Sequence, residues 1–432
     1  MSAEGPGTEA ADRREFRWNY VAHVLDGGLF MGALGFVSGT TVMPTIIKRL
    51  GGPDWLVSLM PVMLMMGFMV PPVFTAHRIE RLGRYMPLLL VTGIFQRLPY
   101  LVAALALLVG AGTAPLWVLA AVAVAPLVSG MSGGVSMTAW QQLVLRTVRP
   151  NRLSSVFATR YVLSAALGLG AGWVVKAVLA AWPGEVGYGV LHLCAFGSVA
   201  LSYAAFALIR EGRAERLPEG EAVGLWENLR AIPGLLAGER RLALYLGSQA
   251  FANGIFILAP FLAMHAQRSL GRPESYLGDL LIAQMVGAIV GNLVSGYLGD
   301  RFGGKVVMMM SQGLFVWLSC WSAMAASDAA FRAIFFLFGF AFFSLQVGRH
   351  TLVLGLCPTT RRSTYLAMTS LVNLPSILAA TGLSAAVWRD GVGFVHLAWS
   401  TAACVALSLV LVSRVRDPRG ETAAPAPAGG AP

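Results

Sequence analysis

Five ionisable side chains lie deep inside long apolar stretches of this sequence. Asp26 is the carboxylate, His23 lies three residues before it on the same helical face, and Arg97, Arg160 and Arg349 are the cations. Ionisable residues in such apolar surroundings usually serve an ion, proton or solute pathway. Asp26 and His23 are therefore candidates for proton coupling. The alternative for Asp26 is a fixed ion pair with Arg160 or Arg349, and both interpretations are open.

Amide side chains in the same kind of stretch are candidates for contacts with a polar solute. Gln249 and Asn253 are four residues apart and share one helical face, and Gln284 and Asn373 lie in two further apolar stretches. With the three arginines they form our candidate set for a substrate cavity, although hydrogen bonds between helices are an alternative role for the amides. Three interior arginines against one interior carboxylate favour an anionic or acidic solute.

The composition indicates which elements position these side chains. Hydrophobic residues make up 56% of the chain, charged residues only 12%, and the mean hydropathy is +0.67. Soluble proteins carry about 25% charged residues. A chain with so few charges is predicted to lie in a bilayer as an all-helical protein, because only helices and closed barrels satisfy the backbone there. A span needs about 20 apolar residues, so the 432 residues accommodate roughly a dozen.

The hydropathy pattern predicts twelve transmembrane helices. We place them at 19–45, 54–76, 85–110, 115–145, 153–181, 187–209, 241–265, 275–298, 305–326, 331–354, 363–387 and 392–413.

These spans divide the chain into two halves with cytoplasmic ends. The predicted parts are a cytoplasmic tail (1–18), a six-helix bundle (19–209), a cytoplasmic linker with an amphipathic helix (210–240), a second six-helix bundle (241–413) and a disordered cytoplasmic tail (414–432). The side that holds both termini carries 22 of the 32 Lys and Arg residues and the opposite loops carry six. Basic residues collect in cytoplasmic loops. This bias explains the net charge of +11 without nucleic acid.

Two charges near the outer ends of spans have simple local explanations. Lys176 is expected to reach the membrane surface with its long side chain, and Asp279 to cap the first turn of its helix.

A short loop motif repeats between the halves. Glu80, Arg81 and Gly83 follow the second span, and Asp300, Arg301 and Gly303, with Lys305 close behind, follow the eighth at an offset of 220 residues. Two six-helix halves with matched loops are typical of a transporter that rocks around a central site.

The stretch GYLGDRFGGK around the second copy resembles the loop signature of the major facilitator superfamily between helices 8 and 9. The copy at Glu80 is similar to its partner between helices 2 and 3. The resemblance implies two pseudo-symmetric six-helix bundles, with a central cavity lined by helices 1, 4, 7 and 10. It also implies that both motif copies act as a cytoplasmic gate.

Physical arguments support the gate independently. Asp300 can accept hydrogen bonds from the start of helix 11 near Ser363, and Glu80 from the start of helix 5 near Ser154, because carboxylates are stabilised at helix N-termini. A stripe of small residues every four positions on the eighth span allows another helix to pack closely against it. The stripe consists of Gly287, Gly291, Ser295 and Gly299.

One motif suggests an enzyme. GMSGG at 130–134 matches G-x-S-x-G, it resembles the serine motif of rhomboid proteases, and His192 supplies a candidate base. A hydrolase elbow needs a strand-to-helix turn, whereas this stretch lies inside an apolar helix, where glycine and serine normally form a packing surface. An intramembrane serine protease is therefore the least favoured alternative.

The sequence thus predicts a monomeric secondary active transporter, not an enzyme, in the bacterial inner membrane. It would move a small organic solute by alternating access, with proton-coupled export as the first expectation and uptake or exchange of an organic anion as the alternative. Its partners would be the solute, protons and the lipid bilayer, and neither a cofactor nor a metal site is expected.

Overall fold

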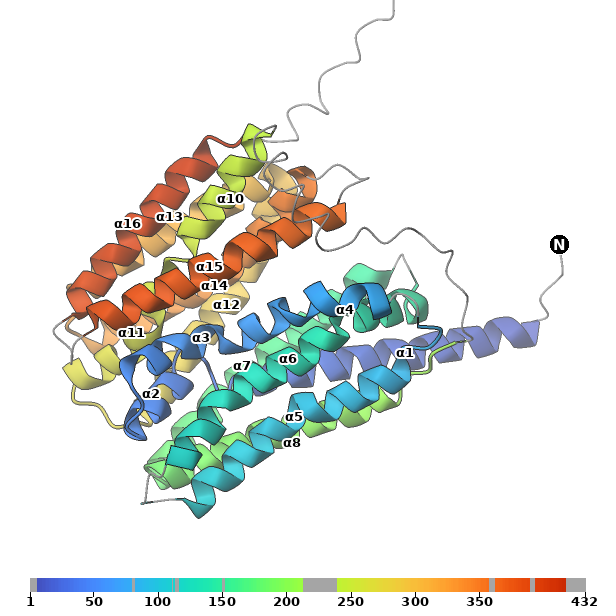
Figure 1. The fold of residues 1–432 in the computed structure, drawn as a ribbon, viewed down its shortest axis with the longest axis horizontal. Helices are drawn as coiled ribbons and strands as arrows, with labels where there is room; N and C mark the ends of the chain where they lie inside the picture. The colour runs from blue at the N-terminus through green and yellow to red at the C-terminus, as the bar shows by residue number, and fades with distance from the viewer. Residues whose placement is uncertain are drawn as a thin grey trace, which may run out of the picture. The chain divides into compact units, whose positions relative to one another are not determined.

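The structure, a computed structural model, is all-helical over the residues that it describes (Figure 1). These are 6–79, 82–110, 112, 116–149, 152–212, 239–356, 362–388 and 393–416. Eight helical stretches among them are long and apolar enough to cross a membrane, with 240–269 taken as one. The predicted amphipathic helix of the linker and the predicted disordered tail fall largely outside the described residues.

Nine predicted spans are formed by one helix each, with ends close to the predicted ones. They are α5 (Met86–Val109), α6 (Leu116–Thr147), α7 (Leu153–Ala181), α8 (Glu185–Ala207), α12 (Tyr276–Phe302), α13 (Gly304–Ser322), α14 (Asp328–Leu356), α15 (Arg362–Val387) and α16 (Phe394–Ser413).

The other three spans are each split into two helices, which the sequence analysis did not predict. The pairs are α1 (Pro6–Ala33) with α2 (Val42–Arg49), α3 (Asp54–Met69) with α4 (Pro71–Ile79), and α10 (Arg240–Ala252) with α11 (Ile255–Ser269). A helix or a pair of helices thus lies at each of the twelve predicted positions, and the all-helical prediction is confirmed over the described residues. In addition, α1 starts at Pro6, inside the segment predicted as a tail.

Each break has a local cause. Pro71 begins α4 directly after Val70, and a proline has no N–H to continue a helical ladder. Between α1 and α2, Ser38 O accepts the N–H groups of Val42 and Met43 at 3.0 and 2.9 Å and so starts the new helix. Between α10 and α11, Gly254 N bonds Phe251 O at 3.0 Å, a tightened turn.

The chain forms two compact units that do not coincide with its two sequence halves. Residues 1–224 group with 262–282 in the first unit, and 225–261 group with 283–432 in the second. Helix α11 therefore begins in the second unit and ends in the first, whereas α12 begins in the first and ends in the second.

Glycines set the packing of the first unit. Gly28 and Gly32 of α1 face Leu163 and Leu167 of α7 so closely that a Cβ at either glycine would overlap the leucine. Gly27 likewise leaves room for the guanidinium of Arg160. Small residues allow helices to approach closely in membranes, and here they bring the polar part of α1 against α7.

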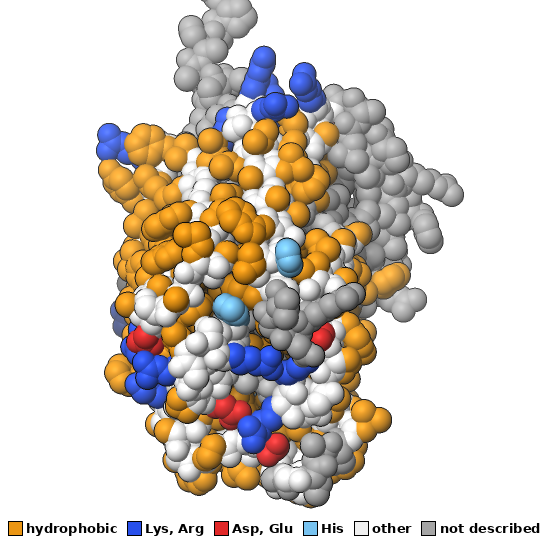
Figure 2. Space-filling view, turned by 90° about the vertical axis from the view of Figure 1, so that its left-hand side faces the viewer, with side chains coloured by type: hydrophobic (Ala, Val, Ile, Leu, Met, Phe, Trp, Pro, Cys, Tyr) orange, Lys and Arg blue, Asp and Glu red, His pale blue; other side chains and the backbone are white. Residues whose placement is uncertain are grey.

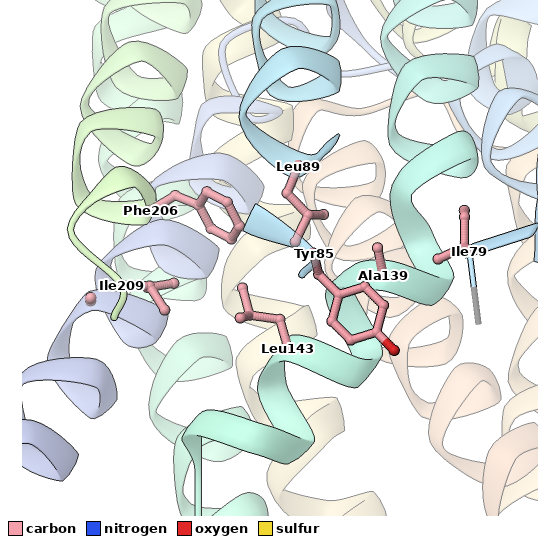
Figure 3. Close-up of a cluster of buried hydrophobic side chains, with 8 residues drawn as sticks. Ile79, Tyr85, Leu89, Ala139, Leu143, Phe206 and Ile209 are labelled. Carbon is pink, nitrogen blue, oxygen red and sulfur yellow. The ribbon is translucent and has the colours of Figure 1, made fainter. Parts of the chain in front are cut away.

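A cluster of buried hydrophobic side chains packs between helices of the first unit (Figure 3). Tyr85, Leu89, Leu143 and Phe206 point toward one another from α5, α6 and α8 and the turn before α5. Glu211, just after α8, caps α5: its carboxylate accepts the N–H groups of Tyr85 and Met86 at 2.9 to 3.1 Å. Arg146 adds a 3.4 Å contact to the same carboxylate.

The small-residue stripe of α12 packs against α14 in the second unit. A Cβ at Gly287 or Gly291 would overlap the backbone carbonyl of Phe336 or Phe340, which confirms close packing for these two positions. The turn between α12 and α13 consists of Gly303 alone, with φ of 89°, a conformation that favours glycine.

The surface is that of a membrane protein. Hydrophobic side chains cover much of the face shown in Figure 2, and the acidic side chains on it lie beside basic ones.

Candidate functional site

In the first unit, α1, α5 and α8 build a buried carboxylate site. Asp26 of α1 is 6% exposed and Arg97 of α5 is 7% exposed. Arg97 Nη2 lies 3.2 Å from Asp26 Oδ1, and Ser202 of α8 donates to the same oxygen at 2.8 Å. The remaining donors of Arg97 are used as well: Nε bonds Val199 O at 2.8 Å and Nη1 bonds Gly93 O at 3.1 Å. Arg97 is thus fully engaged.

Arg160 of α7 is the second cation near Asp26, and it is held more loosely. Its Nη2 lies 4.0 Å from Asp26 Oδ2, at the limit of an ion pair. Its Nη1 is buried and has no hydrogen-bond partner among the described residues. The guanidinium stacks over the ring of Trp140 at 4.9 Å, a cation–π contact. One carboxylate and two guanidinium groups leave this cluster with a net positive charge.

His23 lies one turn before Asp26 but has a different partner. Its Nε2 is 2.8 Å from Thr147 Oγ1, and the Thr147 hydroxyl donates its single hydrogen to Leu143 O at 2.7 Å. His23 Nε2 therefore carries the hydrogen of the contact with Thr147. His23 Nδ1 is buried without a partner among the described residues, so it is the nitrogen left for a further proton.

In the second unit, Arg349 of α14 meets amides instead of a carboxylate. Its Nη2 donates to Asn253 Oδ1 at 3.1 Å, and its Nη1 approaches Gln346 Oε1 at 3.4 Å. Its Nε is buried without a partner among the described residues. The structure therefore leaves Arg349 with unused donors on the edge formed by Nε and Nη2.

The break between α10 and α11 positions Asn253 for this contact. Asn253 follows the last residue of α10, and its amide nitrogen donates to Asn373 Oδ1 at 3.1 Å and Ser376 Oγ at 2.8 Å on α15. One turn earlier, Gln249 donates to the hydroxyl of Tyr245 at 2.6 Å, and that hydroxyl donates to Arg349 O at 3.2 Å. Gln249 Oε1 is buried and has no partner in the described part of the chain.

The sequence offers Arg349 no acidic neighbour at membrane depth. Asp279 is the single Asp or Glu within the predicted spans of the second half, and it is paired with Lys176 of the first unit at 2.9 Å. We call the network around Arg349 the amide cluster; it has a cation and, among the described residues, no carboxylate. Its other members are Gln249, Tyr245, Asn253, Asn373 and Ser376.

The structure places the remaining predicted site residues as follows. Gln284 is buried on α12, against Gly339 of α14. Arg301 donates to the Tyr297 hydroxyl at 2.8 Å and Lys305 to Ser413 O at 2.8 Å. Asp300 is exposed in the last turn of α12, and Gly83 lies in the turn before α5.

Of the predicted gate, Glu80 and Arg81 lie outside the described residues. The same holds for the side chains at the start of α15 that were expected to meet Asp300, and for Ser154.

Several polar side chains that contact the predicted site residues could not be identified from the sequence. Ser202 and Tyr245 complete the two clusters from other turns or helices. Lys176 and Asp279, to which we gave separate local roles, form an ion pair. Arg49 at the end of α2 contacts both Glu185 and Glu274, partners that are 136 and 225 residues away.

The serine motif forms a packing surface. Ser132 lies inside α6 and donates to Val128 O at 2.9 Å, and His192 Nδ1 donates to Tyr188 O at 2.8 Å, each within its own helix. His192 Nε2 has no hydrogen-bond partner among the described residues, so the pair is not hydrogen-bonded. Gly130 and Gly134 bring α6 against Gly67 of α3.

Comparison with known proteins finds similarity to transporters. A family model described as Major Facilitator Superfamily matches residues 244–432. The 4-hydroxybenzoate transporter PcaK of Acinetobacter baylyi is 35% identical over 117 residues, which is 26% of this chain and 25% of that protein. The match thus spans about a quarter of the length of the curated relative.

Solved structures of low sequence identity share the fold over nearly the whole chain. The D-xylose-proton symporter aligns with a TM-score of 0.69 at 13% identity and covers 93% of this chain and 98% of its own. A variant of the nucleoside transporter NupG aligns with a TM-score of 0.67 at 13% identity, and the alignment covers 92% of this chain and 98% of that one. A bacterial homologue of the iron transporter ferroportin, in its inward-facing state, aligns with a TM-score of 0.66 at 16% identity. The alignment covers 93% of this chain and 98% of that one.

Proposed function

We propose that this chain is a multi-pass secondary transporter of the major facilitator superfamily and that its solute is an organic anion; the partial family match and the shared fold support the first part. The proposal includes alternating access in the bacterial inner membrane, with both termini cytoplasmic, as the charge bias of the loops favours.

The observation that carries the proposal is the free edge of Arg349. An intramembrane arginine is costly and normally has a partner. Arg349 has a buried, unused Nε and only one of its two Nη2 hydrogens is needed for Asn253. The guanidinium edge matches a carboxylate, which can accept two parallel hydrogen bonds. A bound carboxylate would supply the negative charge that the amide cluster lacks.

Two further observations support an anion. The first-unit cluster also has more guanidinium groups than carboxylates, because Arg97 and Arg160 surround Asp26 alone. The relative from Acinetobacter is named for 4-hydroxybenzoate, which is a carboxylate. The loosely held Arg160 is therefore proposed as a second solute contact, while Arg97 serves Asp26. Gln249, Asn253, Asn373 and Gln284 are proposed as the polar wall of the site.

A thermal-shift series on the purified protein tests the solute class. Benzoate and 4-hydroxybenzoate should raise the melting temperature, because a ligand of the folded state stabilises it. Benzamide and 4-hydroxybenzamide, which have nearly the same shape without the charge, should not. Arg349→Gln should weaken carboxylate binding about 10- to 100-fold, since charged hydrogen bonds contribute about 1.5–3 kcal/mol. Arg349→Lys should restore little of the carboxylate affinity, because a lysine ammonium cannot donate the two parallel hydrogen bonds that a planar guanidinium donates.

Equal stabilisation by the amides and the carboxylates would contradict an anion site. If Arg349→Gln bound carboxylates as tightly as the wild type, the anion site would lie outside the amide cluster.

Proton coupling is the second part of the proposal, and His23 supports it better than Asp26 does. Asp26 is engaged by Arg97 and Ser202, whereas His23 has a free nitrogen. In proteoliposomes with an imposed pH gradient, solute flux should follow the gradient in the wild type and lose that dependence in His23→Gln. A dependence lost in Asp26→Asn and kept in His23→Gln would assign the proton to Asp26. Export is the direction that we expect to observe.

The gate is proposed for the motif residues on the side of the termini. Asp300, Arg301, Gly303 and Lys305, with Glu80, Arg81 and Gly83 in the other half, would close the cytoplasmic side. Gly303 alone connects α12 and α13, so Asp300 lies in the last turn of α12 and Lys305 in the first turn of α13. Asp300→Asn should raise the labelling rate of cysteines introduced on the cytoplasmic side, and an unchanged rate would contradict the role of Asp300.

A further inference from the structure

The segment 262–282 belongs by sequence to the second half but packs in the first unit. It holds the end of α11, the connection 270–275 and the start of α12. The charge bias places this connection on the side opposite both termini, which we call the outer side. What attaches the segment to the first unit is therefore important for opening of that side.

Arg49 provides the first attachment. It ends α2, at the outer end of the first span. Its Nε lies 3.2 Å from Glu185 Oε1 of α8, and its Nη1 lies 2.8 Å from Glu274 Oε1 of the segment. The other oxygen of Glu274 accepts the N–H of Gly184 at 3.3 Å. Glu274 is thus bound from two sides, by a guanidinium and by a backbone amide.

The electrostatics of Arg49 agree with this geometry. Burial by itself would lower the pKa of Arg49, but the carboxylates of Glu274 and Glu185 outweigh that effect and raise the pKa above its ordinary value. The side chain of Arg49 is 41% exposed and that of Glu274 is 15% exposed, so water can reach the pair when it separates.

A second attachment lies on α7 and α12. Lys176 Nζ is 2.9 Å from Asp279 Oδ1. Beside this ion pair, Gly278 meets the backbone of Gly172 and Lys176 so closely that a Cβ at Gly278 would overlap both. Two glycines therefore bring the backbones together, and the ion pair closes over them.

We infer that Arg49, Glu185, Glu274, Lys176 and Asp279 form an outer latch, which holds the segment 262–282 on the first unit and must break before the outer side can open. Ion pairs that are partly exposed are individually weak, so the latch can be broken repeatedly. Contacts present in one state only shift a two-state equilibrium toward that state. The inference rests on alternating access, which is part of the proposed function, and it is independent of the nature of the solute.

Distance measurements between spin labels test the latch on the full-length protein. One label is placed at Trp55, at the start of α3, and one at Ser269, at the end of α11. Both positions are exposed. The four native cysteines (Cys194, Cys320, Cys357 and Cys404) are replaced by alanine in all variants. Wild type, Arg49→Gln and Lys176→Gln are then compared without solute.

The expected result is a second, longer distance population in both latch variants, with at least a twofold rise in its share over the wild type. The control is Lys48→Gln. Lys48 neighbours Arg49 and forms a 2.6 Å ion pair with Asp54 of α3, but this pair does not involve 262–282. The distance distribution of Lys48→Gln should match that of the wild type.

Unchanged distributions in both latch variants would overturn the inference, and so would an equal shift in Lys48→Gln. If Arg49→Gln does not fold, Lys176→Gln decides the question alone. Failure of the solute proposal is separate, because it appears as missing stabilisation by carboxylates and leaves the label distances as they are.

Discussion

The two buried arginine sites differ in how their charge is satisfied. In the first unit, Arg97 has a carboxylate 3.2 Å away and uses its other donors on carbonyl and hydroxyl oxygens. Among the described residues of the second unit, the Arg349 guanidinium donates only to amide oxygens, and its Nε has no partner. A charge with an internal partner contributes to the folded structure, whereas a buried charge surrounded by neutral dipoles still lacks a counter-charge.

The largest effect is expected from breaking the first site. Arg97→Met should lower the free energy of unfolding by about 3–5 kcal/mol, because it leaves Asp26 as a buried charge without its main partner. Chemical unfolding in detergent measures this. Arg160→Met is the matched control. Because the Arg160 guanidinium lies 4.0 Å from Asp26, this variant should lose much less free energy of unfolding. Similar losses in the two variants would contradict the separate roles of these arginines.

An intermediate effect is expected from making the second site resemble the first. Asn253→Asp places a carboxylate beside Arg349, where Asn253 Oδ1 already accepts its hydrogen bond. The new internal partner should lower the affinity for carboxylates by about 10- to 100-fold, corresponding to about 1.4–2.8 kcal/mol. Asn253→Ser, which removes the amide without adding charge, should lose less. Binding that survives Asn253→Asp would show that Arg349 is not the anion contact.

The smallest effect is expected on the stability of the second unit. Arg349→Met should change the free energy of unfolding by less than about 1 kcal/mol, since it removes a buried charge that has no charged partner to lose. The same unfolding assay applies, with Arg97→Met as the contrasting variant. A loss as large as that of Arg97→Met would mean that the amide cluster is itself a structural requirement.

The sequence predicted the elements well because hydropathy is a local property. Nine spans matched single helices, and the stripe at Gly287 and Gly291 indicated a close helix contact that the structure contains. The split spans were harder, since proline occurs within intact helices as well: Pro99 and Pro126 lie inside α5 and α6, whereas Pro71 begins a new helix.

Pairing between helices could not be predicted from spacing alone. The ion-pair alternative for Asp26 names Arg160 or Arg349. Arg160 does lie 4.0 Å from the carboxylate, but the nearest cation is Arg97, which is 71 residues away on α5. Which guanidinium reaches the carboxylate depends on the rotation of each helix, and Gly27, Gly28 and Gly32 fix that rotation for α1 only after α7 has packed. The partners of Arg49 depend in the same way on where α8 and the start of α12 lie.

One consequence follows from the path of α11. This helix starts in one unit and enters the other at residue 262, so a displacement of either unit against the other has to deform it. Pro260 lies two residues before that boundary, and its ring nitrogen cannot donate to the carbonyl one turn earlier. Helix α11 therefore bends most easily near Pro260. Replacing Pro260 by leucine would restore this donor and make α11 harder to bend, and it would leave the contacts of Asp26 and Arg349 as they are.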